Sequence, residues 1–485
     1  MKKLTTYKIL FHYSFLAIIT FLIWASVGSK FISLSNTNDI NIKFLINNLR
    51  FFLPIILIIT LIYFNQNYQK NTNLNVIIFA IFISFIIGNY NLYNNNNDLI
   101  KIFNNNDILI QFGYMTNFFR DLMMSFFFIS VYLIYSRLDQ TQTQTILILN
   151  FIFLALLSFI TLYFAYLEYF SIKNDREYLY FTQFLITGEL YGVPTIRSLG
   201  LSRNLLIILI PLSFFSLFGK TKKYNIYLNI FIIFLCLNIF QLQSRLTIYS
   251  FVIFSFLILS YLIFKKKIKK VIYFVFIFLI IPQFLNLLVP NIKKYYFEDN
   301  EQILINDQKK SSIIIDFIQK LEIPQSRVFT RTPNNPEIIK QANEEKYNEI
   351  LVKEFSSGRT ELWKNTLKIF TDSNDYKNLM LGFGTSADRY FLKESASSAF
   401  FYSIISGGLL GLLFLIMFYL YLLNLIYFFL VNRKKIENKI MIYSVITIII
   451  FIMLRSLVES SFLVFGTDNI ILFSCLFFLQ NKKNI

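Results

Sequence analysis

The sequence predicts an all-α integral membrane protein, and three observations indicate this fold class. Of the 485 residues, 55% are hydrophobic and only 15% are charged, a balance that excludes a water-soluble globule of this size. Long apolar stretches recur along the chain, and a helix of about 20 apolar residues crosses a hydrocarbon core of about 30 Å. Lys and Arg residues gather in the short segments that separate alternate stretches.

Twelve stretches are long and apolar enough to be candidate transmembrane helices, because each helical residue adds about 1.5 Å of length. Their approximate centres lie within residues 9–28, 46–64, 74–90, 115–135, 146–168, 201–218, 225–243, 246–264, 271–289, 398–430, 440–457 and 467–480. The first stretch is too long for a signal-peptide core and is interpreted as a retained span. The tenth is long enough for one tilted span plus an interfacial turn, and the twelfth is short.

The basic residues predict the orientation of these spans. If there are twelve spans, every basic cluster falls on one side, and basic residues in short loops mark the cytoplasm. Both termini are then inside, and the net charge of +18 reflects topology and not nucleic-acid binding. The clusters are Lys2, Lys3 and Lys8; Lys220, Lys222 and Lys223; Lys265 to Lys270; Arg433, Lys434, Lys435 and Lys439; and Lys482 and Lys483.

A polar segment of about 105 residues divides the chain into three parts. Residues 1–290 form a membrane bundle of spans one to nine, residues 291–397 form a large external loop, and residues 398–485 form spans ten to twelve. The loop is expected to be mostly helical. Asn335-Pro336-Glu337 is typical of a helix start, and Ser356-Ser357-Gly358 ends that helix before a second helix begins at Arg359.

The sequence offers few residues for metal or nucleophilic catalysis. Its one histidine, His12, and its two cysteines, Cys236 and Cys475, all fall inside predicted spans, where such residues are ordinarily part of the packing. No cofactor and no metal are expected. The external acids that could serve as a general base, and that could equally be solvated loop residues, are Glu168, Glu189, Asp388, Glu394 and Glu459.

Six arginines stand at the outer ends of spans or in the external loops: Arg197, Arg203, Arg245, Arg359, Arg389 and Arg455. An arginine near mid-membrane costs about 2.5–3.5 kcal/mol, so those that persist commonly face a cavity or mark a pathway. Any one of them could instead reach to lipid headgroups. Several guanidinium groups that converge at the outer face would form a diphosphate site, and a helix that begins at Arg359 would add its free N–H groups.

Three segments of the chain resemble the bacterial O-antigen polymerase and O-antigen ligase superfamily. They are Arg197-Ser-Leu-Gly200-Leu-Ser-Arg203-Asn204, Ser244-Arg245, and Gly358-Arg359 with Trp363 and Gly382-Phe383-Gly384. The segment from Ser397 to Gly411 also resembles the family's re-entry into the membrane. The resemblance covers roughly residues 190–430 and extends to the topology of the whole chain.

The resemblance implies a GT-C-like enzyme of the bacterial inner membrane that acts on its periplasmic side. The enzyme would move a glycan from undecaprenyl diphosphate onto an incoming lipid-linked repeat unit, without a metal. Arg197, Arg245 and Arg359, together with Arg203, would hold the diphosphates, and Glu394, or else Asp388, would take the acceptor proton. The partners implied are the undecaprenyl-diphosphate-linked oligosaccharide, membrane lipids and a chain-length regulator.

One departure from the superfamily favours a polymerase. Its ligases carry a histidine shortly before the Gly-Leu-Leu-Gly segment, and the corresponding position here is Ser397. A ligase that transfers finished glycan to another acceptor remains an alternative. A flippase for lipid-linked oligosaccharides is the non-enzymatic alternative, since it would also use cationic residues to hold a diphosphate.

Overall fold

The computed structural model of the chain describes residues 13–24, 72–94, 114–171, 185–190, 193–197, 199–219, 225–242, 244–286, 288, 359–372, 376–385, 387–392, 396–432, 438–459 and 466–483. Within these ranges the elements are helices, joined by short turns and loops, and one β-hairpin, in which β1 (Leu185–Leu190) pairs antiparallel with β2 (Val193–Arg197). The second predicted span, at residues 46–64, and the predicted helix from Asn335 to about Phe355 lie outside them. His12 does as well.

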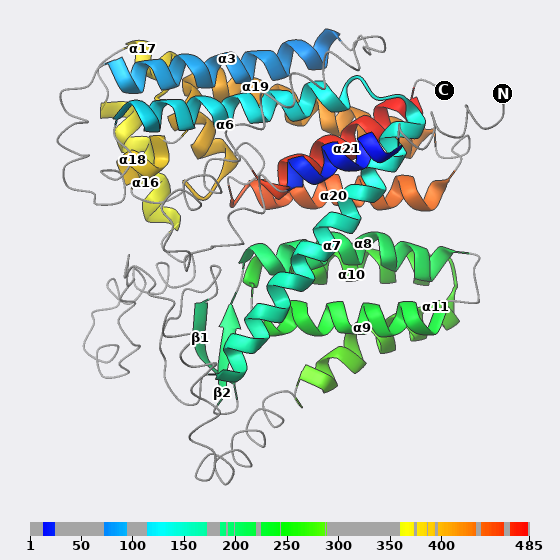
Figure 1. Ribbon diagram of the computed structural model, residues 1–485. Helices are drawn as coiled ribbons and strands as arrows, with labels where there is room; N and C mark the ends of the chain where they lie inside the picture. The colour runs from blue at the N-terminus through cyan, green and yellow to red at the C-terminus, as the bar shows by residue number, and fades with distance from the viewer. Residues whose placement is uncertain are drawn as a thin grey trace.

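The helices follow the predicted order of apolar stretches (Figure 1). They are α3 (Thr72–Asn94), α6 (Tyr114–Tyr135), α7 (Gln140–Ser171), α8 (Leu199–Phe218), α9 (Asn225–Gln241), α10 (Arg245–Phe264), α11 (Ile268–Phe274), η2 (Val275–Ile280), α16 (Arg359–Asp372), α17 (Tyr376–Leu381), α18 (Ala387–Leu392), α19 (Ala399–Val431), α20 (Lys439–Ser456) and α21 (Thr467–Lys483). A further helix, Tyr13–Trp24, precedes them.

Seven of the described helices are long and apolar enough to cross a membrane: α3, α7, α8, α10, the continuous helix Ile268–Asn286, α19 and α20. Three shorter apolar helices are Tyr13–Trp24, Met124–Tyr135 and Ile226–Gln241. The prediction of a helical, multi-pass membrane protein is therefore confirmed.

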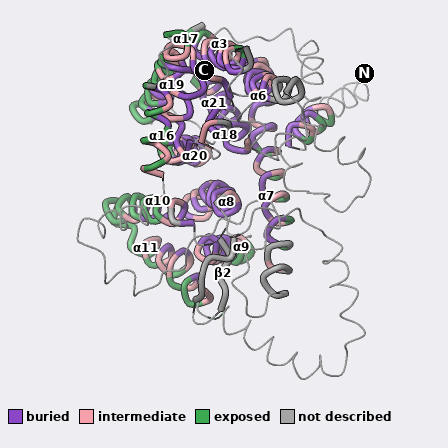
Figure 2. The backbone as a smooth tube through the Cα atoms, turned by 90° about the vertical axis from the view of Figure 1, so that its left-hand side faces the viewer, coloured by how far each residue is buried: buried purple, intermediate pink, exposed green. Residues whose placement is uncertain are grey.

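The helices form two groups that α7 connects as it crosses obliquely between them (Figure 1). In one group α19 packs along α3, and α21 packs against α7, α20 and α6; in the other α8 packs against α9. The groups also meet where α8 packs on α20. Helix α21 is buried on every side from Thr467 to Asn481, so it runs through the inside of the bundle (Figure 2).

A break in α19 fixes the loop that carries Gly382-Phe383-Gly384. Gly408 has φ 62° and ψ −158°, which interrupts the helical hydrogen bonding. The carbonyl oxygens of Ile405 and Ser406 instead accept the N–H groups of Phe383 and Gly384, both at 2.8 Å. Irregular backbone at membrane depth is tolerated where such partners exist. The loop is thus joined to α19 by main-chain hydrogen bonds.

Side chains of α3 and α19 also hold this loop. Asn89 of α3 accepts the backbone N–H of Thr385 at 2.8 Å, and Tyr402 of α19 donates to the Thr385 carbonyl at 2.6 Å. Asn89 also donates to Ser125 of α6 at 3.4 Å. Because Asn89 and Thr385 are both buried, these bonds replace contacts with water and fix where the loop lies on the bundle.

Helix α16 is anchored where the chain enters α19. The indole N–H of Trp363 donates to the Ala396 carbonyl at 3.1 Å, and its ring stacks on Phe401 at 5.2 Å. On the same helix Thr366 and Phe370 are buried. These contacts hold the start of α16 at one end of the bundle.

Candidate functional site

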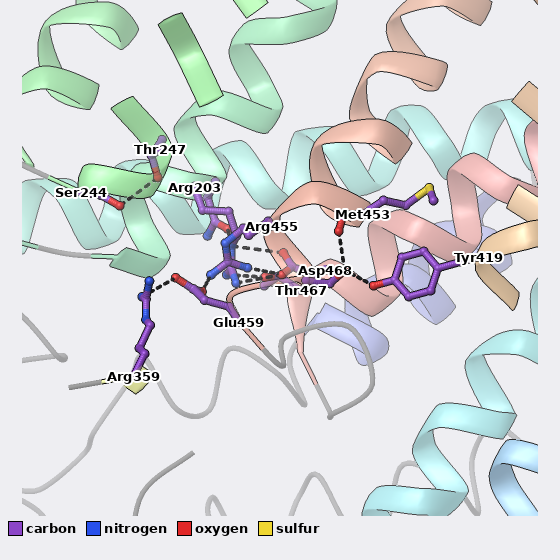
Figure 3. Close-up of polar contacts among 12 residues, drawn as sticks. Arg203, Ser244, Thr247, Arg359, Tyr419, Met453, Arg455, Glu459, Thr467 and Asp468 are labelled. Carbon is purple, nitrogen blue, oxygen red and sulfur yellow. Dashed lines mark hydrogen bonds and ion pairs between the residues drawn. The ribbon is translucent and has the colours of Figure 1, made fainter. Parts of the chain in front are cut away.

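A cluster of alternating charges joins the start of α8, the end of α20, the start of α21 and the start of α16 (Figure 3). Its members are Arg203, Asp468, Arg455, Glu459 and Arg359. We call these five residues the charged cluster. Arg203 and Asp468 are more than 260 residues apart in the sequence, so it is the packing of the helices that brings the five residues together.

Arg203 is held on all three nitrogens of its guanidinium group. Nη2 donates to Thr467 at 2.6 Å, Nη1 donates to Asp468 at 3.3 Å, and Nε donates to the neighbouring Asn204 at 3.0 Å. Nε also lies 3.1 Å from the second carboxylate oxygen of Asp468. The bonds to Thr467 and Asp468 tie the start of α8 to the start of α21.

Arg455 is the most deeply buried arginine of the cluster, with 4% of its side chain exposed. It forms an ion pair with Asp468, whose side chain is fully buried. It forms a second ion pair with Glu459, which lies four residues later in the sequence. Two buried guanidinium groups therefore share the carboxylate of Asp468. A buried carboxylate in this position offsets the cost of removing both cations from water.

Arg359 is the least engaged of the three arginines. Its Nη2 lies 3.7 Å from Oε1 of Glu459, an ion-pair distance too long for a hydrogen bond, and no other ion pair of Arg359 is found in the described ranges. About a quarter of its side chain is exposed. Burial lowers the pKa of the Arg359 guanidinium below its ordinary value, although an arginine stays charged at neutral pH.

The charged cluster carries a net charge of about +1 from three guanidinium groups and two carboxylates. Arg203 and Arg455 are paired with Asp468, whereas Arg359, the first residue of α16, has only the long contact with Glu459 among the ion pairs of the described residues. The first turn of a helix also leaves backbone N–H groups without intrahelical partners. An anion that reaches Arg359 would meet both kinds of donor.

The structure places the other predicted arginines on defined elements. Arg197 is the last residue of β2, opposite Leu185 in the hairpin, and β2 lies against α7 and α9. Arg245 is the first residue of α10, as the break between α9 and α10 predicts. Their side chains lie outside the described part of the structure. Of the four predicted diphosphate-binding arginines, the described contacts thus bring Arg203 and Arg359 into one cluster.

The predicted general bases lie in different surroundings. Asp388 of α18 is buried and accepts the backbone N–H of Ala396 at 3.0 Å, so its carboxylate supports the segment that leads into α19. Glu459 is bound by Arg455 and Arg359. Glu394 lies outside the described residues.

Asp468 and Thr467 were not among the predicted site residues. The available signal was an acid in the first turn of a helix otherwise expected to be apolar, since an ionisable group there needs a partner. Arg455 carried the same signal at the end of α20. Pairing these two positions would have required knowing that the two helix ends meet.

The charged cluster must be interpreted from its own chemistry. No family model, no curated protein and no solved structure matches this chain. The function of the cluster is therefore inferred from the contacts of its five residues and from the elements that carry them.

Proposed function

We propose that this protein is a polymerase of lipid-linked glycans in the bacterial inner membrane. It would transfer a growing polysaccharide from undecaprenyl diphosphate onto an incoming lipid-linked repeat unit at the periplasmic face. The polymer would be an O-antigen, a capsule or an exopolysaccharide. The proposal rests on the sequence resemblance and on the character of the charged cluster.

The observation that carries the proposal is the position of Arg359. A partly exposed guanidinium, whose one ion pair within the described residues spans 3.7 Å, stands at the start of α16, beside two arginines that are paired with Asp468. Guanidinium groups bind phosphate oxygens bidentately, and a helix start favours anions. Arg359 is accordingly the arginine to which we assign the diphosphate of the donor lipid.

The proposed reaction balances without a redox step. A sugar hydroxyl of the acceptor forms a bond to the anomeric carbon of the donor glycan, while the bond from that carbon to the diphosphate oxygen breaks. Undecaprenyl diphosphate leaves with the bonding electrons, and Arg359 stabilises the negative charge that develops on it. The hydroxyl proton passes to a base. Glu394 is the proposed base, as the sequence resemblance implies, whereas Asp388 and Glu459 accept donors in the described structure.

The contacts of the cluster support the proposed topology of twelve spans with both termini in the cytoplasm. That topology puts the starts of α8 and α21 and the end of α20 on the outer side, and these are the ends that Arg203, Asp468 and Arg455 join. The loop containing α16 would lie on the same side. Donor lipid and charged cluster would then meet at the periplasmic surface.

Reconstitution with one synthetic lipid-linked repeat unit tests the proposal. Purified protein in liposomes is incubated with the repeat unit, and the products are separated on a gel. A polymerase gives a ladder, and Arg359→Ala should abolish the ladder while the protein still inserts and folds. Adding a chelator should leave the ladder unchanged.

The other outcomes separate the alternatives. A single transfer to a different acceptor would identify a ligase, and movement of the lipid across the bilayer with no new bond would identify a flippase. Full-length ladders from Arg359→Ala would remove Arg359 from the mechanism. A ladder that disappears with chelator would point to a metal-dependent class of glycosyltransferase.

A further inference from the structure

The carboxylate of Glu459 is shared unequally between two arginines. Its Oε2 forms a hydrogen-bonded ion pair with Arg455, which lies one helical turn before it, whereas its Oε1 lies 3.7 Å from Arg359. The side chain of Arg359 is 24% exposed, compared with 4% for that of Arg455. The contact with Arg359 is thus the weaker one and the nearer to solvent.

The two contacts use separate oxygen atoms, so one can open without the other. If Arg359 moves to an incoming anion, Glu459 stays bound to Arg455, and Arg455 stays bound to Asp468. Arg203 likewise keeps its bonds to Thr467 and Asp468. When a ligand binds, Arg359 alone changes its partner, from Glu459 to the ligand, and the other contacts of the cluster remain.

We propose that Glu459 is the resident counter-ion of Arg359, which a diphosphate displaces when it binds and which Arg359 rejoins when the diphosphate leaves. This inference rests on the proposed function and deepens it, because it assigns to Glu459 a positioning role in ligand release. Without ligand, the carboxylate keeps the guanidinium near the start of α16. With ligand, it competes for the same cation.

The carboxylate of Glu459 is expected to weaken the binding of diphosphate. A carboxylate beside the anion site repels the diphosphate and also offers Arg359 an alternative partner, so both effects weaken diphosphate binding. Glu459→Gln keeps the size of the side chain and can still accept a hydrogen bond from Arg455, but it removes the charge. Diphosphate should bind more tightly to this variant and dissociate more slowly, and turnover limited by product release should fall.

Inorganic pyrophosphate is the probe for this test, because it carries the charged group without the lipid or the glycan. The full chain is placed in nanodiscs, and pyrophosphate is titrated while tryptophan fluorescence is recorded. Trp363 lies one turn after Arg359 on α16 and reports on the site. The other tryptophan of the chain, Trp24, donates to Asn150 of α7. Glu459→Gln should lower the Kd about fivefold.

A matched charge removal supplies the control. Asp139 precedes α7 and accepts the backbone N–H of Gln142, a role that Asn can also fill. Asp139 lies far from the charged cluster. Its neighbour Leu138 accepts a hydrogen bond from Asn481. Asn481 is about 20 Å from Asp468 along α21, at about 1.5 Å per residue. Asp139→Asn should leave the Kd within about twofold, because charges at that distance are largely screened.

The outcomes distinguish this inference from the proposed function. Tighter pyrophosphate binding in Glu459→Gln, lost again when Arg359→Ala is added, supports the inference. Unchanged or weaker binding in Glu459→Gln overturns it, and so does binding that does not depend on Arg359. The ladder assay then decides separately whether the protein is a polymerase. Glu459→Asp, which keeps the charge on a shorter side chain, should give a smaller gain in affinity and replaces the Gln variant if the latter does not fold.

Discussion

The charged cluster and the junction between α19 and the Gly382-Phe383-Gly384 loop stabilise the bundle by different means. The cluster uses ion pairs, in which one partner can be exchanged for a ligand of the same charge. The junction uses main-chain hydrogen bonds around Gly408, and these have no side chain that a ligand could replace. The comparison indicates that the junction supports the structure, whereas the cluster can combine support with binding. Within the cluster, Arg203, Arg455 and Asp468 stabilise the helix bundle.

The largest loss of stability is expected at the junction. Gly408→Ala puts a Cβ atom 2.5 Å from the main chain of Met380, at a residue with φ 62°. Either the loop or α19 must move, so we expect a loss of at least about 3 kcal/mol in the free energy of unfolding, or no folded protein. Thermal unfolding in detergent measures it. Gly200→Ala in α8 is the matched control, because its nearest neighbouring atom is 4.0 Å from the new Cβ, and it should be neutral or slightly stabilising.

The next largest effect is expected at the centre of the charged cluster. Asp468→Asn leaves Arg203 and Arg455 buried without their shared carboxylate, and breaking a buried pair in this way costs about 3–5 kcal/mol. We expect a correspondingly lower unfolding midpoint in the same detergent. An Asp468→Asn protein as stable as the wild type would show that Asp468 is not structural.

A moderate effect is expected from the polar contacts that support the junction. Asn89→Leu removes the acceptor of the Thr385 N–H and leaves that buried group unsatisfied, at a cost of about 1–3 kcal/mol. The measurement is again thermal unfolding. Asn432→Leu removes a half-exposed bond to the Phe428 carbonyl at the end of α19, and its effect should be clearly smaller.

The smallest effect on stability is expected at Arg359, although its effect on activity should be complete. Its ion pair with Glu459 at 3.7 Å is partly exposed, and such pairs contribute about 0–1 kcal/mol. Arg359→Ala should therefore unfold within about 1 kcal/mol of the wild type, while it loses the polymer ladder. If the variant lost as much stability as Asp468→Asn, the division between supporting and binding arginines would be wrong.

Much of the helical architecture could be predicted from hydropathy and from local signals. The breaks before Arg245 and at Gly358 predict where α10 and α16 begin, and the structure confirms both starts. These features depend on residues close together in the chain, so the sequence carries them directly. The count of twelve spans and their orientation stay predictions.

The pairing within the site could not be predicted, because it depends on which helix ends meet. Arg203, a predicted ligand-binding residue, donates to Asp468, 265 residues later, and to Thr467. Gly382-Phe383-Gly384 stands out in the sequence as one of the segments that carry the family resemblance. Its bonds to the carbonyls freed at Gly408 follow from tertiary packing alone.

The break at Gly408 also divides the length of α19. A continuous helix of 33 residues measures about 50 Å, well beyond a hydrocarbon core of about 30 Å. The part after Gly408, residues 409–431, measures about 35 Å and matches the core with a modest tilt. Hydrophobic thickness therefore does not constrain the part of α19 before Gly408, and a change in bilayer thickness would be taken up by the tilt of the part after it.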